Sequence, residues 1–216
     1  MRRYSKKIKL AAVDDEKINE LLDRADEYKL AEKHREAIKI CEEILIDEPS
    51  CVEAYEEIGD NFISLNLLQK AEKALRKAVE LDPKSANAAY LLGFLFSCRR
   101  EWEKSIRFLE KADELKPNHP EILRCLGWSL AMAGERGKGI ILLERAKTLA
   151  PDDVYVLTDL GVCYLNEKNI EQALPIFRRV LEIDPDNEKA RDCLVIVEEY
   201  ANSAKKLRTQ SVKRKT

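Results

Sequence analysis

The sequence predicts an all-α fold: a right-handed superhelical solenoid of about five helix-turn-helix units with a C-terminal capping helix. Five prolines, Pro49, Pro83, Pro117, Pro151 and Pro185, follow one another at a spacing of 34 residues, and a fixed period of this length is typical of stacked repeats. Each unit contains two apolar stretches at helical spacing, separated by a short polar turn. Neither helix can bury its apolar stripe alone, so neighbouring units are expected to stack.

The period divides the chain into consecutive segments. Residues 1–13 form a basic N-terminal segment predicted to be flexible, and residues 14–204 form the repeat domain. The repeats are expected at 18–51, 52–85, 86–119, 120–153 and 154–187. A capping helix is expected at 188–204, with Leu194, Ile196 and Val197 packing inward. Residues 205–216 form a basic tail predicted to be disordered.

Each helical pair has a predicted end and a predicted point of close approach. Proline ends the second helix, because it lacks an N–H and disfavours a helical conformation of the residue before it. A small residue recurs 24 positions before the prolines, where two helices are expected to approach each other: Ala25, Gly59, Gly93, Gly127 and Gly161. The fourth unit has three glycines at its turn, Gly134, Gly137 and Gly139. Because glycine weakens helix initiation, we interpret this turn as loose, with a hinge as the alternative.

The distribution of charge bears on the class of ligand. Residues 1–13 carry five basic and no acidic side chains, and residues 201–216 carry six basic and no acidic ones, although the formal net charge is -2. The negative charge is therefore concentrated between them. A body of this sign repels phosphate backbones, so we expect no nucleic-acid binding by the folded part.

The cysteines and the apolar segments bear on location. The six cysteines lack close pairing along the chain, which favours reduced thiols over a disulfide framework. The basic start is not followed by the apolar core of a secretory signal, and no segment approaches the roughly twenty apolar residues that a spanning helix needs. The predicted location is cytoplasmic.

The sequence contains no recognisable catalytic equipment. His34 and His119 lie in different units and match no metal-ligand spacing. Glycine-rich phosphate loops, nucleophile elbows and paired catalytic carboxylates are not found, and the many acidic residues follow the solvated faces of the helices. We therefore expect no enzyme activity, no cofactor and no metal.

The repeat pattern itself resembles the tetratricopeptide repeat family over roughly residues 18–185. The fifth unit carries the pattern as Leu157, Leu160, Gly161, Tyr164, Ala173, Phe177, Val180 and Pro185, and the second unit as Tyr55, Ile58, Gly59, Phe62, Ala71, Leu75, Ala78 and Pro83. The resemblance implies that the first helix of each hairpin lines a concave groove. It also implies a protein–protein interaction scaffold or adaptor that binds a peptide or helix of a partner protein in that groove.

The groove positions implied by the resemblance change character along the chain. The first two units place acidic residues there: Asp23, Asp26, Glu53, Glu56, Glu57 and Asp60. The third to fifth units place mainly apolar and aromatic residues there, with one positive charge: Tyr90, Phe94, Arg124, Trp128, Tyr155 and Val162. We therefore expect a partner with basic residues toward the first two units and apolar anchors near Phe94 and Trp128. The alternative is a solvated acidic face beside rings that pack against the adjacent hairpin.

Three other hypotheses follow from the same residues. The first is a chaperone-like holdase for a specific client or secreted protein, which only the aromatic half of the groove favours. The second is RNA binding, which the acidic body disfavours. The third is self-association, in which the basic N-terminal segment, with Tyr4, Ile8, Leu10 and Val13, occupies its own or a neighbour's groove.

Overall fold

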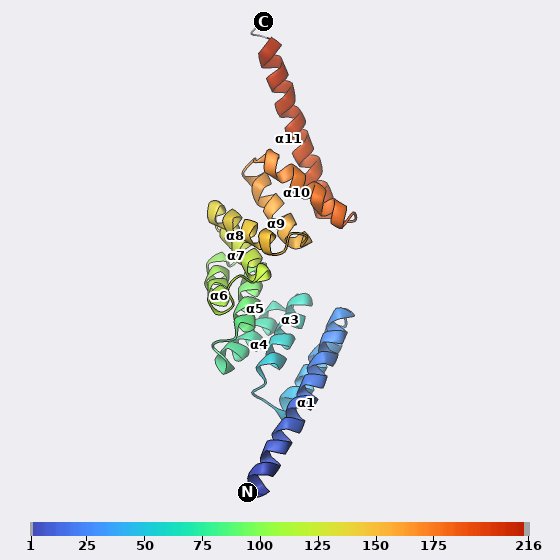
Figure 1. Cartoon of the computed structure of the whole chain (residues 1–216), viewed down its shortest axis with the longest axis vertical. Coiled ribbons are helices and arrows are strands. Elements are labelled where there is room, and N and C mark those ends of the chain that lie inside the picture. Colours follow the sequence, from blue (N-terminus) through green and yellow to red (C-terminus); the bar gives the residue numbers. More distant parts are fainter. Residues whose placement is uncertain (1, 214–216) are drawn as a thin grey trace. The chain divides into compact units, whose positions relative to one another are not determined.

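The computed structural model describes the backbone of residues 2–213 and the side chains of residues 16–200, and every regular element within the described backbone is an α-helix (Figure 1). The chain divides into two compact units, Met1–Arg100 and Glu101–Thr216. Unit 1 contains α1 (Arg2–Leu30), α2 (His34–Asp47), α3 (Val52–Ser64), α4 (Leu68–Leu81) and α5 (Ala86–Cys98). Unit 2 contains α6 (Trp102–Leu115), α7 (Pro120–Met132), α8 (Arg136–Leu149), α9 (Val154–Asn166), α10 (Ile170–Ile183) and α11 (Glu188–Lys213).

The helices pair as hairpins, which confirms the predicted all-α helical-repeat fold. In unit 1, α1 packs against α2 and α3 against α4. In unit 2, α7 packs against α8 and α9 against α10, and α11 lies against both α9 and α10. The helices α3, α5, α7, α9 and α11 begin at positions 52, 86, 120, 154 and 188, so the period of the prolines is also the period of the helices.

The two outermost helices are longer than the others. The first, α1, has 29 residues, and the last, α11, has 26. The segments 1–13 and 205–216, for which flexible and disordered chain was predicted, therefore have a helical backbone over the residues that the structure describes. Their side chains lie outside the described residues.

Each second helix ends directly before the proline, as predicted. The residues that cap α2, α4, α6, α8 and α10 have φ between -127° and -136°, outside the helical region: Glu48, Asp82, Lys116, Ala150 and Asp184. A residue before proline is driven out of the helical conformation by a clash with the proline ring. The helix boundaries are thus a direct consequence of the local sequence.

The turns inside the hairpins share a left-handed residue that the sequence does not reveal. Glu32, Asn66, Arg100, Gly134 and Lys168 recur at the repeat spacing and have φ between 55° and 99°. In four of these turns the next residue, Lys33, Leu67, Glu135 or Asn169, donates its backbone N–H across the helix end at 2.8–2.9 Å. Gly134 alone adopts this conformation without steric cost. The turn that contains Gly134 makes the same backbone hydrogen bond as the turns that contain Glu32, Asn66 and Lys168.

The recurring small residues mark places where helices touch. A Cβ atom built on Gly59 would lie 2.4 Å from the Leu75 side chain, and one on Gly161 would lie 2.9 Å from the Phe177 ring. Between α7 and α8 the contact involves backbone on both sides: a Cβ on Gly127 would lie 2.8 Å from the carbonyl oxygen of Gly139. Gly139 is buried. The prediction of close approach is confirmed, and Gly139 is part of a helix contact, not of a loose turn.

Alanine substitutions at two glycines of α8 are expected to change stability in opposite directions. A Cβ on Gly139 would lie 2.5 Å from the Gly127 carbonyl oxygen, whereas a Cβ on Gly137 would have no atom within 4 Å. Gly139→Ala is expected to lower the free energy of unfolding by about 1–3 kcal/mol through overpacking. Gly137→Ala is expected to raise it by up to about 1 kcal/mol through helix propensity. Urea unfolding followed by circular dichroism measures both, and a stabilised Gly139→Ala variant would refute the close approach.

The capping helix α11 agrees only in part with the predicted packing. Val197 is fully buried, and Leu194 packs against the same core of unit 2. Ile196 was expected to pack inward as well, but it is 43% exposed. Val195 follows Gly161 by one repeat and is 54% exposed. Val195 thus occupies the position at which the other repeats have a small residue in a close helix contact. Within the described residues α11 has no second helix of its own hairpin to meet there, so a valine side chain can be accommodated.

Candidate functional site

The acidic groups of unit 1 gather around a lysine that the sequence analysis did not select. The Lys29 Nζ of α1 lies 2.9 Å from Asp26 Oδ1, 2.7 Å from Glu57 Oε2 and 3.4 Å from Asp60 Oδ2. Burial lowers the pKa of Lys29, but the hydrogen bonds to Glu57 and Asp26 outweigh it and the pKa is raised. Burial and the neighbouring Asp26 and Asp60 raise the pKa of Glu57. Three acidic side chains thus share one cation, which leaves this cluster negative.

The remaining acidic candidates of unit 1 have different environments. Asp23 and Glu53 are exposed. Glu56 is only 7% exposed, and its carboxylate accepts hydrogen bonds from Ser85 Oγ and, at 2.8 Å, from Asn87 Nδ2. Because Ser85 and Asn87 lie at the start of α5, Glu56 links α3 to α5, which is a structural role.

Two aromatic candidates lie together on α5. The rings of Tyr90 and Phe94 are stacked, with centroids 6.3 Å apart and planes inclined by 16°. Both side chains are half-buried. They form a preordered aromatic pair in unit 1.

The first helices of the unit 2 hairpins carry a buried ion-pair network. Arg124 Nη1 on α7 lies 2.8 Å from Asp159 Oδ2 on α9, and its guanidinium also pairs with Glu121. The side chains of Arg124 and Asp159 are 13% and 11% exposed. Burial raises the pKa of Asp159, opposed by Arg124, whereas the pKa of Arg124 is raised, because its hydrogen bond to Glu121 and nearby negative charges outweigh its burial. Lys189 Nζ of α11 lies 3.7 Å from Asp159 Oδ1.

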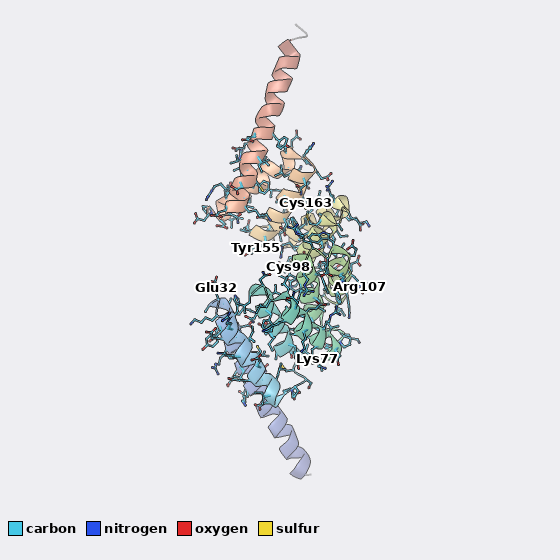
Figure 2. The ribbon with its side chains drawn as sticks, turned by 180° about the vertical axis from the view of Figure 1, so that it is seen from behind. Glu32, Lys77, Cys98, Arg107, Tyr155 and Cys163 are labelled. Carbon is cyan, nitrogen blue, oxygen red and sulfur yellow. The ribbon has the colours of Figure 1, made fainter. Side chains whose placement is uncertain are left out.

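Two aromatic rings lie beside these cations. The Arg124 guanidinium carbon is 5.8 Å from the centre of the Tyr155 ring, and Lys189 Nζ is 5.3 Å from the centre of the Trp128 ring. Both separations fall within the range of a cation–π contact. Tyr155, labelled in Figure 2, is 72% exposed. The structure therefore brings Arg124, Trp128 and Tyr155 onto one surface of unit 2. Trp128 and Val162 are both partly buried and also pack against the core of this unit.

Sequence reasoning missed three residues of this surface: Glu121, Asp159 and Lys189. Glu121, Tyr155 and Lys189 follow one another by one repeat length. Lys189 could have been found from the sequence by comparing residues at equal positions of successive repeats and including the capping helix in that comparison. We call the surface formed by Glu121, Arg124, Trp128, Tyr155, Asp159 and Lys189 the unit 2 face.

The cysteines and the titratable clusters of the described residues were compared with the arrangements that redox and metal chemistry require. The six cysteines form no disulfide, and burial raises the pKa of Cys41 and Cys163 to about 12, so both are neutral thiols at neutral pH. Among the described residues, no group of three or more His, Cys, Asp or Glu side chains is placed to hold a metal ion. None of the helices searched combines the length and apolar character needed to cross a membrane.

The fold and these surfaces define a helical-repeat protein, and comparison with known proteins specifies the repeat. Residues 52–85 and 154–187 each match a family model of the tetratricopeptide repeat. The chain therefore contains tetratricopeptide repeats, matched over these two ranges. No curated protein matches it in sequence.

Solved structures support the same fold. A thermophilic tetratricopeptide repeat protein of Thermus thermophilus is 19% identical, with a TM-score of 0.72 over 83% of this chain and 98% of that one. PilF of Pseudomonas aeruginosa is 16% identical, with a TM-score of 0.73 over 94% and 99%. YrrB, described as a tetratricopeptide repeat protein with an unusual peptide-binding site, is 20% identical, with a TM-score of 0.60 over 80% and 89%. Proteins built from the repeat matched above are in general protein–protein interaction scaffolds.

Proposed function

We propose that the chain is a non-catalytic adaptor that binds a peptide or helix of a partner protein on the faces formed by its first helices. The observation that carries the proposal is Tyr155, an aromatic side chain that is 72% exposed and lies against the Arg124 guanidinium. Because Arg124 is held by Glu121 and Asp159, the ring rests on an ordered support. Exposed aromatic groups on rigid supports are typical anchors of protein interfaces.

The charges favour a partner segment with basic residues as well as apolar ones. In unit 1, Asp26, Glu57 and Asp60 share Lys29, while Asp23 and Glu53 are exposed, so this surface is negative. A basic residue of the partner would complement it and speed association. We propose the cytoplasm as the compartment, because free cysteines are typical of a reducing environment.

Removing the aromatic anchors is expected to reduce partner capture strongly. We expect a Trp128→Ala/Tyr155→Ala variant to recover at least about tenfold less of the specific partners from host lysate. Truncation of an interface anchor commonly costs about 2 kcal/mol or more of binding free energy. Quantitative mass spectrometry of the captured proteins measures this. The matched control is Ile141→Ala, which truncates a 68% exposed apolar residue on the second helix α8.

The outcomes separate the candidate functions. Undiminished capture by the Trp128→Ala/Tyr155→Ala variant would overturn the assignment of the unit 2 face. If the partner depends on these anchors, an additional Asp23→Lys/Glu53→Lys variant tests the charge preference, since both residues are exposed. A chaperone-like holdase, which the exposed Tyr155 also favours, would instead retain many apolar clients at high salt, where exposed charge pairs are screened.

A further inference from the structure

A second surface of unit 1 combines an apolar floor with a basic rim. A groove of about 740 Å³ lies between the second helices α2 and α4 and reaches down to α3. Its floor includes Leu45, Tyr55, Ile58, Phe62 and Ala74. Its volume is within the range of ligand-binding pockets, roughly 300–1,000 Å³. We call it the basic groove.

The basic groove lies on a different side of α3 from the acidic surface described above. Tyr55, Ile58 and Phe62 are spaced at i, i+3 and i+7 along α3 and form one helical stripe. Glu57 follows the floor residue Tyr55 by two residues, and Asp60 follows Ile58 by two residues. Two residues correspond to a rotation of roughly 200° around the helix axis, so both acidic side chains leave α3 on another side. Unit 1 therefore presents an acidic surface and a basic groove on different sides of one helix.

The rim of the groove is positive because four basic side chains of α4 line it: Lys70, Lys73, Arg76 and Lys77. The rim also contains Glu42 and Glu80. Arg76 pairs with Glu72 at 2.7 Å and Lys77 with Glu80 at 3.0 Å, whereas no carboxylate is paired with Lys70 or Lys73 among the described side chains. Lys70 Nζ lies 5.5 Å from the centre of the Phe62 ring, at the boundary between rim and floor. Lys77 is labelled in Figure 2.

The equivalent groove of unit 2 lacks this character. It lies three repeats later, between α8 and α10, and has a volume of about 450 Å³. Gln172 and Pro175 line it in the places of Lys70 and Lys73. Its Arg179 is paired with Asp152 and Glu182. The groove between α8 and α10 therefore does not repeat the unpaired lysines of the second repeat.

We propose that the basic groove binds an acidic, amphipathic segment of a partner protein, at a site separate from the first-helix faces. Apolar side chains of the segment would contact Tyr55 and Phe62, and its carboxylates would pair with Lys70 and Lys73. The ends of this chain are not the occupant, because residues 1–13 and 201–216 contain no acidic residue. The occupant is thus opposite in charge to the segment proposed for the first-helix faces.

Binding of a defined peptide tests the proposal. The probe is a fluorescein-labelled peptide of about twelve residues, with glutamates on one face of a helix and leucine and phenylalanine on the other. Fluorescence anisotropy is expected to show binding in roughly the micromolar range. Lys70→Glu/Lys73→Glu is expected to weaken it about tenfold or more, since two attractive pairs become repulsive. Both lysines are exposed, so the variant is expected to fold.

Matched controls define the outcomes. Lys116→Glu/Lys168→Glu changes the charge equally at exposed positions of unit 2 and should leave binding unchanged. Trp128→Ala/Tyr155→Ala should also bind normally, which separates this site from the proposed adaptor function. Equal binding by the Lys70→Glu/Lys73→Glu variant, or no binding of the acidic peptide, overturns the proposal. Lysine-dependent binding of phosphatidylglycerol vesicles without binding of the peptide would also overturn it and favour a lipid surface.

Discussion

Phe177→Ala is expected to lower the free energy of unfolding of unit 2 by about 3–5 kcal/mol. The Phe177 ring is fully buried, and it fills the space left by the missing side chain of Gly161, since a Cβ there would lie 2.9 Å from Cε1 and Cζ of the ring. Removing the ring leaves a cavity between α9 and α10 that their backbones cannot close. Urea unfolding followed by circular dichroism measures the loss.

A double-mutant cycle makes this expectation specific to the contact. Gly161→Ala alone is expected to destabilise by about 1–3 kcal/mol through overpacking, but less when Phe177 is already alanine, because the ring that it would meet is gone. Ile141→Ala is the control for truncation of an exposed apolar residue and should change stability by about 0.5 kcal/mol or less. Additive effects of Gly161→Ala and Phe177→Ala would show that the two positions do not share a contact.

Asp159→Ala is expected to lower the free energy of unfolding by about 3 kcal/mol, the lower end of the range for breaking a buried ion pair. The lower end applies because Arg124 keeps its second partner, Glu121, whose side chain is 33% exposed. The loss arises because the Arg124 guanidinium, 13% exposed, would remain largely removed from water beside a vacated carboxylate position. Thermal and urea unfolding measure it.

The paired substitution separates burial of a charge from loss of packing. Arg124→Leu/Asp159→Leu is expected to cost less than the sum of the single changes, with a coupling of about 1–3 kcal/mol, because neither charge is left unpaired. Arg179→Ala is the control: it removes an exposed pair with Asp152, 49% and 64% exposed, and should cost about 1 kcal/mol or less. Equal losses from Asp159→Ala and Arg179→Ala would contradict the buried network.

Several elements of the fold followed from single residues of the sequence. The prolines predicted where the second helices end, and the cap residues before them have left the helical region. Gly59, Gly127 and Gly161 predicted close helix contacts, and the structure has atoms within 3 Å of each added Cβ. These signals act through the backbone: proline lacks an N–H and glycine lacks a side chain, so their effect depends little on distant residues.

Other features depended on residues that are distant in sequence. Gly139 was interpreted as part of a loose turn, but the Gly127 carbonyl oxygen lies at the position that its side chain would need. Glu56 was selected as a groove residue, yet Ser85 and Asn87 of another helix bind its carboxylate. The groove residues Asp26, Glu57 and Asp60 were selected without Lys29, which pairs with all three.

The sequence alone thus determined the repeat, its helices and the points where helices touch, because these follow from backbone chemistry that recurs every 34 residues. Only the tertiary structure decided which charges are shared, as at Lys29 and Arg124, and which are left unpaired beside an apolar floor, as at Lys70 and Lys73. The physical reason is the short distance over which one charged side chain neutralises another. A charged side chain is neutralised by whichever partner lies within about 4 Å, and packing brings that partner from another helix.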